Sequence, residues 1–425
     1  PKHWEIKPLQ VIFNQRNEQN NNLEFQTILS LVKDVGVIPY EEKGNVGNKA
    51  KDDLQGYKIA RVNDLVLNKM NAVIGSLGVS KYNGLVSPIY LVLYIANPNY
   101  LITYYSYLFQ IKSVQKFLRK FAYGIMEIRE SIDYLEFKKM FLPLPPLQEQ
   151  KEIAEFLDKK CEKIQNYIDK KQKLITLLQE KKQALINEVV TKGLNPNIEF
   201  KNSEIEYLGL IPHHWEVVKV KYIATTNIGL VYDPSEIATN ENVGYPVLRA
   251  NNIQNGKIDY KDVIYVAKKI DDKQLAISGD LLMCVRNGSE NLLGKTAKIE
   301  NNNFSFGAFT AIIRSDLNNY LYWIFQTEML KKSISSFIVS IGIGQISQDD
   351  IKNFKIPLPP LQEQKEIAEF LDKKCEKINS AIEKTKKQIE LVKEYKNTLI
   401  NEAVCGRVAC SRDFSPTAQN DKKKN

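Results

Sequence analysis

The chain has few of the residues that metal sites, disulfide frameworks and histidine-based catalysis require. Its 425 residues include five cysteines and three histidines, and no two cysteines have the CxxC spacing of a zinc site or redox pair. This cysteine usage suits a reducing compartment. We therefore expect a cytoplasmic protein with no metal site and no disulfide framework.

Long apolar runs are also absent. No run approaches the roughly 20 residues that a membrane-spanning helix needs, so we expect no membrane partner. Hydrophobic residues make up 43% of the chain and charged residues 26%, as in ordinary globular proteins. The length allows about two to four domains, each with its own core.

The motifs of nucleotide-binding and methyl-transfer enzymes are missing or altered. Residues 288–296 resemble a phosphate-binding loop, but five residues separate the two glycines where that loop has four. Residues 342–344 lack the third glycine of a dinucleotide fingerprint. Residues 97–100, NPNY, have an asparagine where the amino-methyltransferase tetrapeptide has its second proline. With no S-adenosylmethionine turn, nucleophile elbow or HExxH motif either, we predict that the chain performs no chemistry itself.

Positive charge exceeds negative charge. The net charge is +9 and the isoelectric point is near 9.0. A basic balance favours a polyanionic partner, with nucleic acid as the first candidate.

The most informative feature is a long internal repeat. Residues 143–164 read PLPPLQEQKEIAEFLDKKCEKI, and residues 357–378 repeat these letters 214 positions later. The tetrapeptide LINE at residue 185 recurs with the same offset. A weaker echo, PKHWE at residues 1–5 and PHHWE at residues 212–216, opens each half. The chain is therefore two copies of one plan, in which a variable block precedes a constant block.

Each constant block is predicted to be a long amphipathic helix. Prolines precede both blocks, and Gly193, Pro196 and Gly406 follow them, as is typical of helix starts and stops. Between these signals apolar residues alternate at spacings of three and four, which is the seam of a coiled coil. At 1.5 Å per residue, about 44 residues give a helix of about 66 Å. The predicted seam residues are Ile153, Leu157, Ile164, Ile168, Leu178, Leu185, Ile367, Leu371, Ile378, Ile382, Val392 and Leu399.

A helix with a single apolar stripe needs a partner, and the other copy is the obvious one. A whole variable block lies between the copies, so we expect the chain to return and form an antiparallel pair. Lys171, Lys182 and Lys396 interrupt the seam, where lysine can set the register at some cost in stability. In a fully overlapped pair Cys161 would face the region around Ile389 and not Cys375, which excludes a disulfide between the repeated cysteines.

The variable blocks are predicted to be modules of mixed helices and strands. Asn-Gly pairs such as Asn83-Gly84 and Asn255-Gly256 are typical of tight turns. The β-rich runs lie at residues 64–67 and 88–93 in the first block and at residues 280–285 and 309–313 in the second. A helical stretch follows them, at residues 104–121 in the first block and 320–337 in the second.

The predicted fold class is therefore α+β, with mixed α/β modules. Two globular modules are joined by two long antiparallel coiled-coil helices in a pseudo-two-fold repeat. The predicted boundaries are 1–142 for the first module, 143–194 for the first helix, 195–215 for a linker, 216–356 for the second module, 357–408 for the second helix and 409–425 for a disordered tail.

The loops of both modules carry the residue types that contact DNA. Arginine and lysine pair with guanine edges or phosphates, and asparagine and glutamine pair with adenine, although each is also common in solvated loops. Tyr123, Arg129 and Gln345 are candidates because their loops precede the long helix at corresponding places in the two halves. Ser131 matches Gln345 by the repeat offset. The candidates are Lys69, Asn71, Ser76, Lys81, Tyr123 and Arg129 in the first module and Arg249, Asn251, Arg286, Asn287, Ser289 and Gln345 in the second.

The PLPPLQEQKEIAEFLD block, the PxHWE echo and the two-fold repeat together resemble the specificity subunit of type I restriction–modification enzymes. The segments GSLGVSKYNGLVSPIY (residues 75–90) and GQI (residues 344–346) also resemble that family's target-recognition domains. The resemblance implies two such domains, each reading one half of a split site on double-stranded DNA. It also implies that the helices set the spacing and dock two modification subunits. Those partners would carry S-adenosylmethionine, and restriction subunits would use ATP and Mg, so this chain would bind no cofactor.

Two other interpretations stay open from the residues alone. One is a coiled-coil structural adaptor with no nucleic-acid partner, and steeply salt-dependent DNA binding would count against it. The other is a self-sufficient methyltransferase or NTPase, which the missing motifs oppose. Binding of S-adenosylmethionine or ATP by the isolated chain would favour that enzyme.

Overall fold

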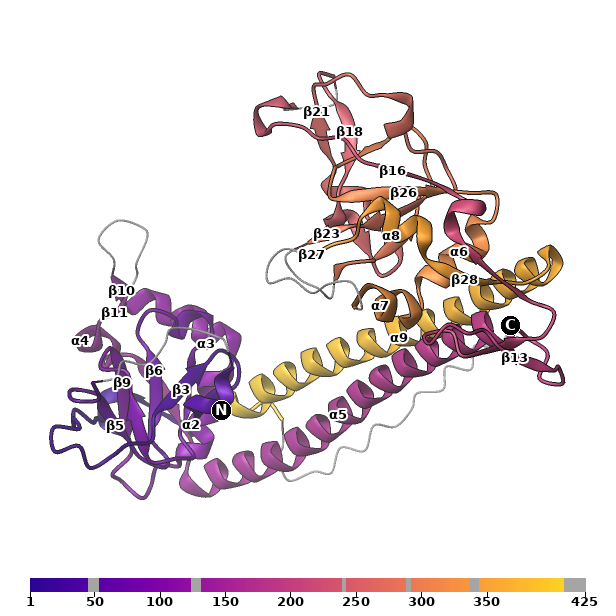
Figure 1. Cartoon of the computed structure of the whole chain (residues 1–425). Helices are drawn as coiled ribbons and strands as arrows, with labels where there is room; N and C mark the ends of the chain where they lie inside the picture. The colour runs from indigo at the N-terminus through magenta and orange to yellow at the C-terminus, as the bar shows by residue number, and fades with distance from the viewer. Residues whose placement is uncertain (45–52, 124–130, 239–241, 288–291, 336–343, 409–425) are drawn as a thin grey trace, which may run out of the picture. The chain divides into compact units, whose positions relative to one another are not determined.

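The computed structural model describes residues 1–44, 53–123, 131–238, 242–287, 292–335 and 344–408 (Figure 1). The chain divides into two compact units, which are described separately below. Unit 1 holds residues 1–171 and 387–425, and unit 2 holds residues 172–386. Each unit therefore contains one module and one half of each long helix, so the units divide the helices that the sequence suggested as separate domains.

The two constant blocks form single long helices, as predicted. Helix α5 (Leu147–Lys192) and helix α9 (Leu361–Val404) each begin directly after a Pro-Pro pair, whose missing N–H groups suit a helix start (Figure 1). Gly193 and Gly406 follow them with φ of +76° and +68°. This left-handed conformation ends a helix and favours glycine.

The helices run antiparallel, and both units show it. In unit 1, Cys161 of α5 lies close enough to Lys396 of α9 for its thiol to interact with that charge. In unit 2, Cys375 of α9 lies beside Lys182 of α5, whose Nζ donates a hydrogen bond to Asn379 Oδ1 at 3.0 Å. Burial raises the pKa of both thiols, that of Cys375 to about 11, and the lysines partly oppose this shift. The repeated lysine thus meets the repeated cysteine in each unit.

The register of the pair differs from the fully overlapped arrangement that we expected. The thiol of Cys161 interacts with the charge of Lys396, which is seven residues, or about 10 Å, further along α9 than Ile389, and the Lys182–Asn379 hydrogen bond shows an offset in the same direction. The last turn of α9 packs on the first module as well as on the beginning of α5. Tyr104 Oη, for example, donates to the Val404 carbonyl at 3.1 Å in the interior of unit 1.

Every predicted seam residue is buried or half-buried. Ile153 belongs to the core of unit 1 and Ile367 to the core of unit 2. Ile186 and Ile400, which are 3% exposed and were outside the predicted seam, join these cores because their side of the helix carries a module. The half-buried seam residues are Ile168, Leu178, Leu185, Ile378, Val392 and Leu399.

The first module is built on small antiparallel sheets. Its four-stranded sheet has the order β2 (Asn14–Gln15), β9 (Tyr90–Tyr94), β6 (Leu65–Asn68), β7 (Leu77–Val79). Two-stranded sheets pair β1 (Glu5–Pro8) with β12 (Phe141–Leu144), β3 (Leu29–Val32) with β4 (Gly36–Pro39), β5 (Lys58–Ala60) with β8 (Gly84–Val86), and β10 (Ala122–Tyr123) with β11 (Ser131–Ile132). The helices are α1 (Leu9–Ile12), α2 (Ile102–Gln110), α3 (Lys112–Phe117) and α4 (Tyr134–Phe137).

The second module repeats this plan and extends it. Its six-stranded sheet has the order β16 (Thr225–Ile228), β26 (Thr310–Arg314), β22 (Leu281–Cys284), β24 (Thr296–Lys298), β20 (Lys257–Ile258), β19 (Ile253–Gln254). A four-stranded sheet has the order β17 (Ile237–Ala238), β21 (Ile264–Val266), β18 (Tyr245–Leu248), β25 (Ser305–Phe306). The strand pairs are β15 (Glu216–Lys219) with β28 (Lys355–Leu358), β23 (Arg286–Asn287) with β27 (Gly344–Gln345), and β13 (Phe200–Asn202) with β14 (Leu210–Pro212). The helices are α6 (Asn318–Phe325), α7 (Glu328–Ser335) and α8 (Gln348–Asn353).

The central strand of each module begins with the same contact, a buried aspartate that pairs with an arginine. Strands β6 and β22 lie where the β-rich runs were predicted, and each is preceded by a buried aspartate. Asp64 accepts from the backbone N–H of Arg61 and pairs with Arg16. Asp280 accepts from the backbone N–H three residues before it and pairs with Arg314. A buried carboxylate that lost its arginine would cost several kcal/mol, about 3–5, so these pairs fix the start of each central strand.

The constant residues clamp each module to its long helix. Glu149, in the first turn of α5, accepts hydrogen bonds from His3 Nε2 at 2.7 Å and from Trp4 Nε1 at 2.9 Å. Glu363 of α9 accepts hydrogen bonds from His214 Nε2 at 2.6 Å and from Trp215 Nε1 at 3.0 Å. The PxHWE echo and the QEQ segment recur together because they are two halves of one contact.

A second repeated carboxylate holds the variable helices. Tyr107 Oη of α2 donates to Asp158 of α5 at 2.5 Å, and Trp323 Nε1 of α6 donates to Asp372 of α9 at 3.0 Å. Asp158 and Asp372 are related by the repeat offset, whereas their aromatic partners differ. The constant helices therefore offer the same acceptor to two unlike modules.

Several local predictions need correction. Each stretch predicted as one helix before a constant block is two helices, and in the first module the extended backbone of Ile111 separates them. Asn255 and Gly256 form the predicted two-residue turn, with φ of +53° and +79° between β19 and β20. Gly84 instead begins β8, where a Cβ would lie 2.7 Å from the Thr27 carbonyl oxygen, so glycine is needed there for close approach.

The expected linker, residues 195–215, is folded. It forms the hairpin of β13 and β14, and it places Leu208 and Ile211 in the core of unit 2. Gly193 lies against the Trp215 ring, with a Cβ position 3.1 Å from Trp215 Cζ2. The expected tail, residues 409–425, lies outside the described residues.

The register predicts a specific cross-link in unit 1. Lys396→Cys should join Cys161 through a short thiol-reactive cross-linker, because Cys161 lies beside residue 396 in the antiparallel pair. Peptide mapping by mass spectrometry would identify the linked pair. The control Tyr395→Cys places the new thiol at a side chain that is 57% exposed and should not join Cys161. Equal linking of both variants would contradict the register.

Candidate nucleic-acid interface

Most candidates in the second module gather around one exposed aromatic ring. The Arg286 guanidinium lies over the Phe309 ring, with Cζ 5.3 Å from the ring centroid. The backbone N–H groups of Val285 and Arg286 both donate to the Phe309 carbonyl, at 2.9 and 3.3 Å. Phe309 is 57% exposed although two strands hold its backbone. The ring is therefore a fixed support for an arginine at the surface.

Gln345 lies directly across the strand pair from Arg286. Strands β23 and β27 place Arg286 opposite Gln345 and Asn287 opposite Gly344. Arg286 and Gln345 are both exposed. A guanidinium and an amide side by side are the donors and acceptors that pair with base edges in the major groove.

Arg249 and Asn251 share one carboxylate. Asn251 Nδ2 donates to Asp262 Oδ2 at 2.8 Å, and Arg249 Nη2 donates to the same oxygen at 3.3 Å. The Arg249 Nε group is buried and has no hydrogen-bond partner among the described residues. Asp262 therefore orients both side chains while leaving the Arg249 Nε–H unsatisfied.

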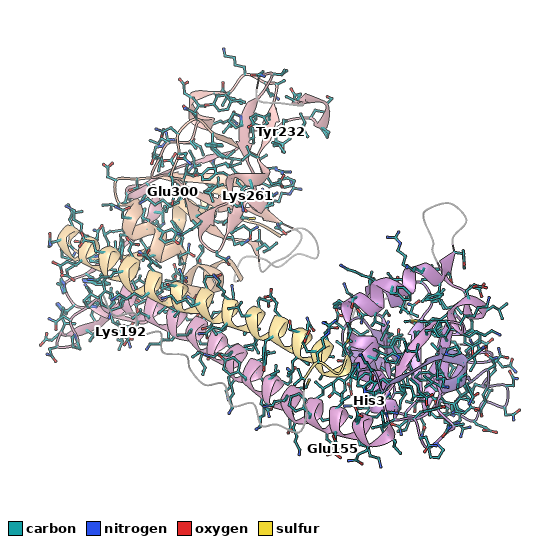
Figure 2. The ribbon with its side chains drawn as sticks, turned by 180° about the vertical axis from the view of Figure 1, so that it is seen from behind. His3, Glu155, Lys192, Tyr232, Lys261 and Glu300 are labelled. Atoms are coloured by element: carbon teal, nitrogen blue, oxygen red, sulfur yellow. The ribbon has the colours of Figure 1, made fainter. Side chains whose placement is uncertain are left out.

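A cavity of about 430 Å³ connects these residues to the aromatic ring. Arg249 and Asn251 form its polar part, while Val231, Tyr232 and Phe309 contribute apolar walls. Figure 2 labels Tyr232 in this module. Val231 is 70% exposed, so an apolar side chain that lines this cavity faces the surface. Sequence reasoning missed Phe309, Tyr232 and Val231 because apolar residues were assigned to the core.

The candidates of the first module do not form one cluster. Lys69 and Asn71 follow the end of β6, and Asn71 is exposed. Tyr123, which is 61% exposed, pairs with Ser131 in the β10–β11 ladder. The Lys69 carbonyl accepts from the backbone N–H of Ile132, so this ladder joins the end of β6. Lys69, Asn71 and Tyr123 thus belong to one end of the module.

Lys81 and Ser76 do not belong to that exposed group. Lys81 follows Ser80, whose backbone N–H donates to the Asp64 carbonyl at the start of β6, so Lys81 lies at the opposite end of this sheet. Asp64 and Lys69, which flank β6, are five residues apart along the chain, or about 16 Å in an extended strand. Ser76 is 5% exposed, so it offers almost no surface to a ligand.

Two candidates, Arg129 and Ser289, lie outside the described residues. Asn287 is half-buried, and its side chain interacts with the Cys284 thiol. In the first module, burial lowers the pKa of Lys58, and the positive charge of Lys69 lowers it further. Neighbouring ammonium groups of this kind attract an anion such as a phosphate.

The lysine of the motif that resembles a phosphate-binding loop makes a contact inside the second module. Lys295, in the loop-like motif, donates its Nζ to the Ile253 carbonyl at 2.7 Å and leads into strand β24, not into a helix. No group of three or more metal-ligating side chains is found among the described residues. The same residues include no helix that is long and apolar enough to cross a membrane.

The comparisons with known proteins fit this arrangement. The family model described as type I restriction modification DNA specificity domain matches residues 1–179 and 212–391, once for each half of the repeat. The type I restriction enzyme MjaVIII specificity subunit of Methanocaldococcus jannaschii is 28% identical over 65% of this chain and 64% of its own length. The EcoKI specificity subunit of Escherichia coli K12 is 29% identical over 51% of this chain and 48% of its own length. The matches therefore span less than two thirds of these two relatives. The putative type I restriction enzyme MjaX specificity subunit of M. jannaschii is 26% identical over 96% of this chain and 94% of its own length.

Two solved structures share the fold. A chain from a structural study of complex assembly and conformational transition in a type I restriction–modification system has a TM-score of 0.72 at 16% identity, over 96% of this chain and 99% of that one. The HsdS subunit from Thermoanaerobacter tengcongensis has a TM-score of 0.51 at 17% identity, over 96% of this chain and 98% of its own.

The Asp262 contact predicts a variant that separates stability from recognition. Asp262 is largely exposed, so Asp262→Ala should change the free energy of unfolding by no more than about 0.5 kcal/mol. It also frees Arg249 and Asn251, so we expect tighter non-specific DNA binding and less discrimination between sequences. Urea unfolding and competition binding would measure the two effects. Asp271→Ala, an exposed carboxylate elsewhere in the module, is the control, and an identical DNA-binding profile for both variants would contradict the assignment.

Proposed function

The chain belongs to the family of type I restriction modification DNA specificity domains, and we propose that it is the DNA-recognition subunit of a type I restriction–modification complex. In this proposal each module reads one half of a bipartite site on double-stranded DNA. The observation that carries it is the pairing of one repeated frame with two modules whose central sheets have four strands in the same order but differ in surface residues.

The second module offers the better-defined reading surface. Arg286 and Gln345 lie opposite each other, and Arg249 and Asn251 lie on the cavity beside the Phe309 ring. Arginine pairs with guanine, and asparagine or glutamine with adenine. In the first module we assign this role to Lys69, Asn71 and Tyr123, which share one end of the module.

The long helices would hold the modules apart and bind the partner subunits. Exposed apolar side chains interrupt their polar surfaces: on α5, Leu174 is 39% and Leu177 is 52% exposed, and on α9, Leu391 is 55% and Tyr395 is 57% exposed. The two residues on each helix are three or four positions apart, so they share one face and form an exposed apolar patch of the kind found at protein contacts. We assign this surface to two modification subunits.

The chemistry would then belong to the partners. We propose that modification subunits supply S-adenosylmethionine and that restriction subunits supply ATP and Mg, since this sequence has no motif for any of them. Family membership argues against the self-sufficient enzyme and against an adaptor with no DNA partner.

Methylation mapping tests the proposal directly. Long-read sequencing of DNA from cells that carry this chain and its modification subunit should show a split motif with two unlike half-sites. The motif should disappear when this chain is omitted. A folded, assembled complex that methylates no split motif would contradict the proposal.

Loss of the exposed arginine should affect one base position. Arg286→Ala removes a side chain that pairs with a guanine edge, so we expect a loss of about 1–3 kcal/mol on the correct site and relaxed selectivity at one position. Binding to a panel of sites with single substitutions would measure this effect. Equal weakening on every sequence would instead identify Arg286 as a phosphate contact.

Helix length should determine the spacing of the half-sites. Removing one heptad from each helix, residues 169–175 and 383–389, shortens both by about 10 Å and keeps the seam in phase. We expect the mapped spacing to change while both half-sites keep their sequences. Replacing the same residues with other heptads of equal length is the control. An unchanged spacing in the shortened chain would contradict the ruler role.

A further inference from the structure

The central strands of the two modules can be matched residue by residue. Leu65 opens a three-residue ladder between β6 and β7, and Leu281 opens the equivalent ladder between β22 and β24. Both residues also pair with the long strand on the other side of the sheet. Counting five residues forward along each chain places Met70 in the first module where Arg286 lies in the second.

The neighbouring strands give the second member of the set. Leu93 of β9 faces the first residue of β6, and Ile313 of β26 faces the first residue of β22. Counting four residues back places Ile89 in the first module where Phe309 lies in the second. Each central strand therefore ends beside two matched positions, one on each strand.

A separate hydrogen bond supports this alignment. In the first module Ile132 donates its backbone N–H to the Lys69 carbonyl at 3.0 Å, and in the second Ile346 donates to the Val285 carbonyl at 2.8 Å. Ile132 and Ile346 are related by the repeat offset of 214. Lys69 and Val285 are the residues just before the matched positions, so the count along the strands and the repeat in the sequence agree.

The side chains at the matched positions are exposed in both modules but differ in chemistry. Met70 is 42% exposed, Ile89 is 51% exposed and Phe309 is 57% exposed, although apolar residues are usually buried. Arg286 has no carboxylate partner in the described part of the chain, whereas Arg249 and Arg314 each have one. Its charge is therefore not committed to another residue of this module.

We propose that these matched positions, Met70 with Ile89 and Arg286 with Phe309, are the specificity-determining pair of each module. This inference rests on the proposed DNA-recognition function. In the second module Arg286 donates to O6 and N7 of a guanine, and Phe309 holds the guanidinium in plane. In the first module neither side chain can donate a hydrogen bond, and both contact the 5-methyl group of thymine. The two half-sites differ at this place because one pair reads the acceptor pattern of guanine and the other reads the methyl group of thymine.

Exchange of the residues tests the pair. In methylation mapping of the assembled complex, Arg286→Met should reduce selectivity for guanine at one position of the second half-site by about tenfold or more. Met70→Arg should create a guanine preference at one position of the first half-site. Lys81→Met, at the opposite end of the first module's sheet, is the control and should leave the motif unchanged.

Thymine-to-uracil substitution tests the first module without relying on an exchanged residue. The wild-type complex should bind about fivefold to tenfold more weakly when uracil replaces one particular thymine of the first half-site, because the methyl contact is lost. Ile89→Ala should bind the thymine and uracil sites equally. No sensitivity to uracil at any position of that half-site would overturn the assignment of Met70 and Ile89.

The outcomes separate this inference from the function on which it rests. If the wild-type complex methylates no split motif, this result contradicts both the proposed function and the specificity-determining pair. A normal wild-type motif that Arg286→Met leaves unchanged, or changes in the other half-site, overturns only the pair. Thermal unfolding of each variant in the assembled complex identifies a folding defect, and the uracil measurement then decides the case.

Discussion

A helix of 46 residues with one apolar stripe is not stable alone in water, and this constraint governs the rest of the chain. The two copies run antiparallel, so the beginning of each must be buried against the end of the other. Each unit consequently requires residues from both copies. The repeated carboxylates, Glu149 and Glu363, then attach unlike modules at equivalent places on this constant pair. Because the two helices offer the same contacts, modules with different surfaces can attach to them in the same way.

Much of the fold follows from local sequence signals. The apolar spacing, the prolines before each helix and the glycines after it predicted both long helices to within a few residues. The repeat predicted two modules of one plan, and the β-rich runs predicted the central strands. The register of the helix pair did not follow, because it depends on where Val404 and Tyr104 meet inside unit 1. That contact joins residues 300 positions apart, and no periodicity reports it.

The candidate site was less predictable for a related reason. Residue type alone suggested Lys69 and Lys81 together, but an antiparallel strand carries them to opposite ends of one sheet. Ser76 is polar and yet buried, whereas Phe309 is apolar and yet exposed, so polarity gave the wrong location for both. Arg286 and Gln345 were named from separate loops, and only the pairing of β23 with β27 brings them together. Residue type does not report strand register, and the register decides which of these side chains lie together.

The split composition of unit 1 has a consequence for biosynthesis. Unit 2 is one continuous segment, whereas unit 1 combines residues 1–171 with the last part of α9. Its core includes Ile400, Ala403 and Val404, and Gly406 lies against Trp4 at the other end of the chain. The first module to leave the ribosome is therefore the last to complete its core. Until α9 is finished, that module exposes apolar surface that a chaperone would recognise.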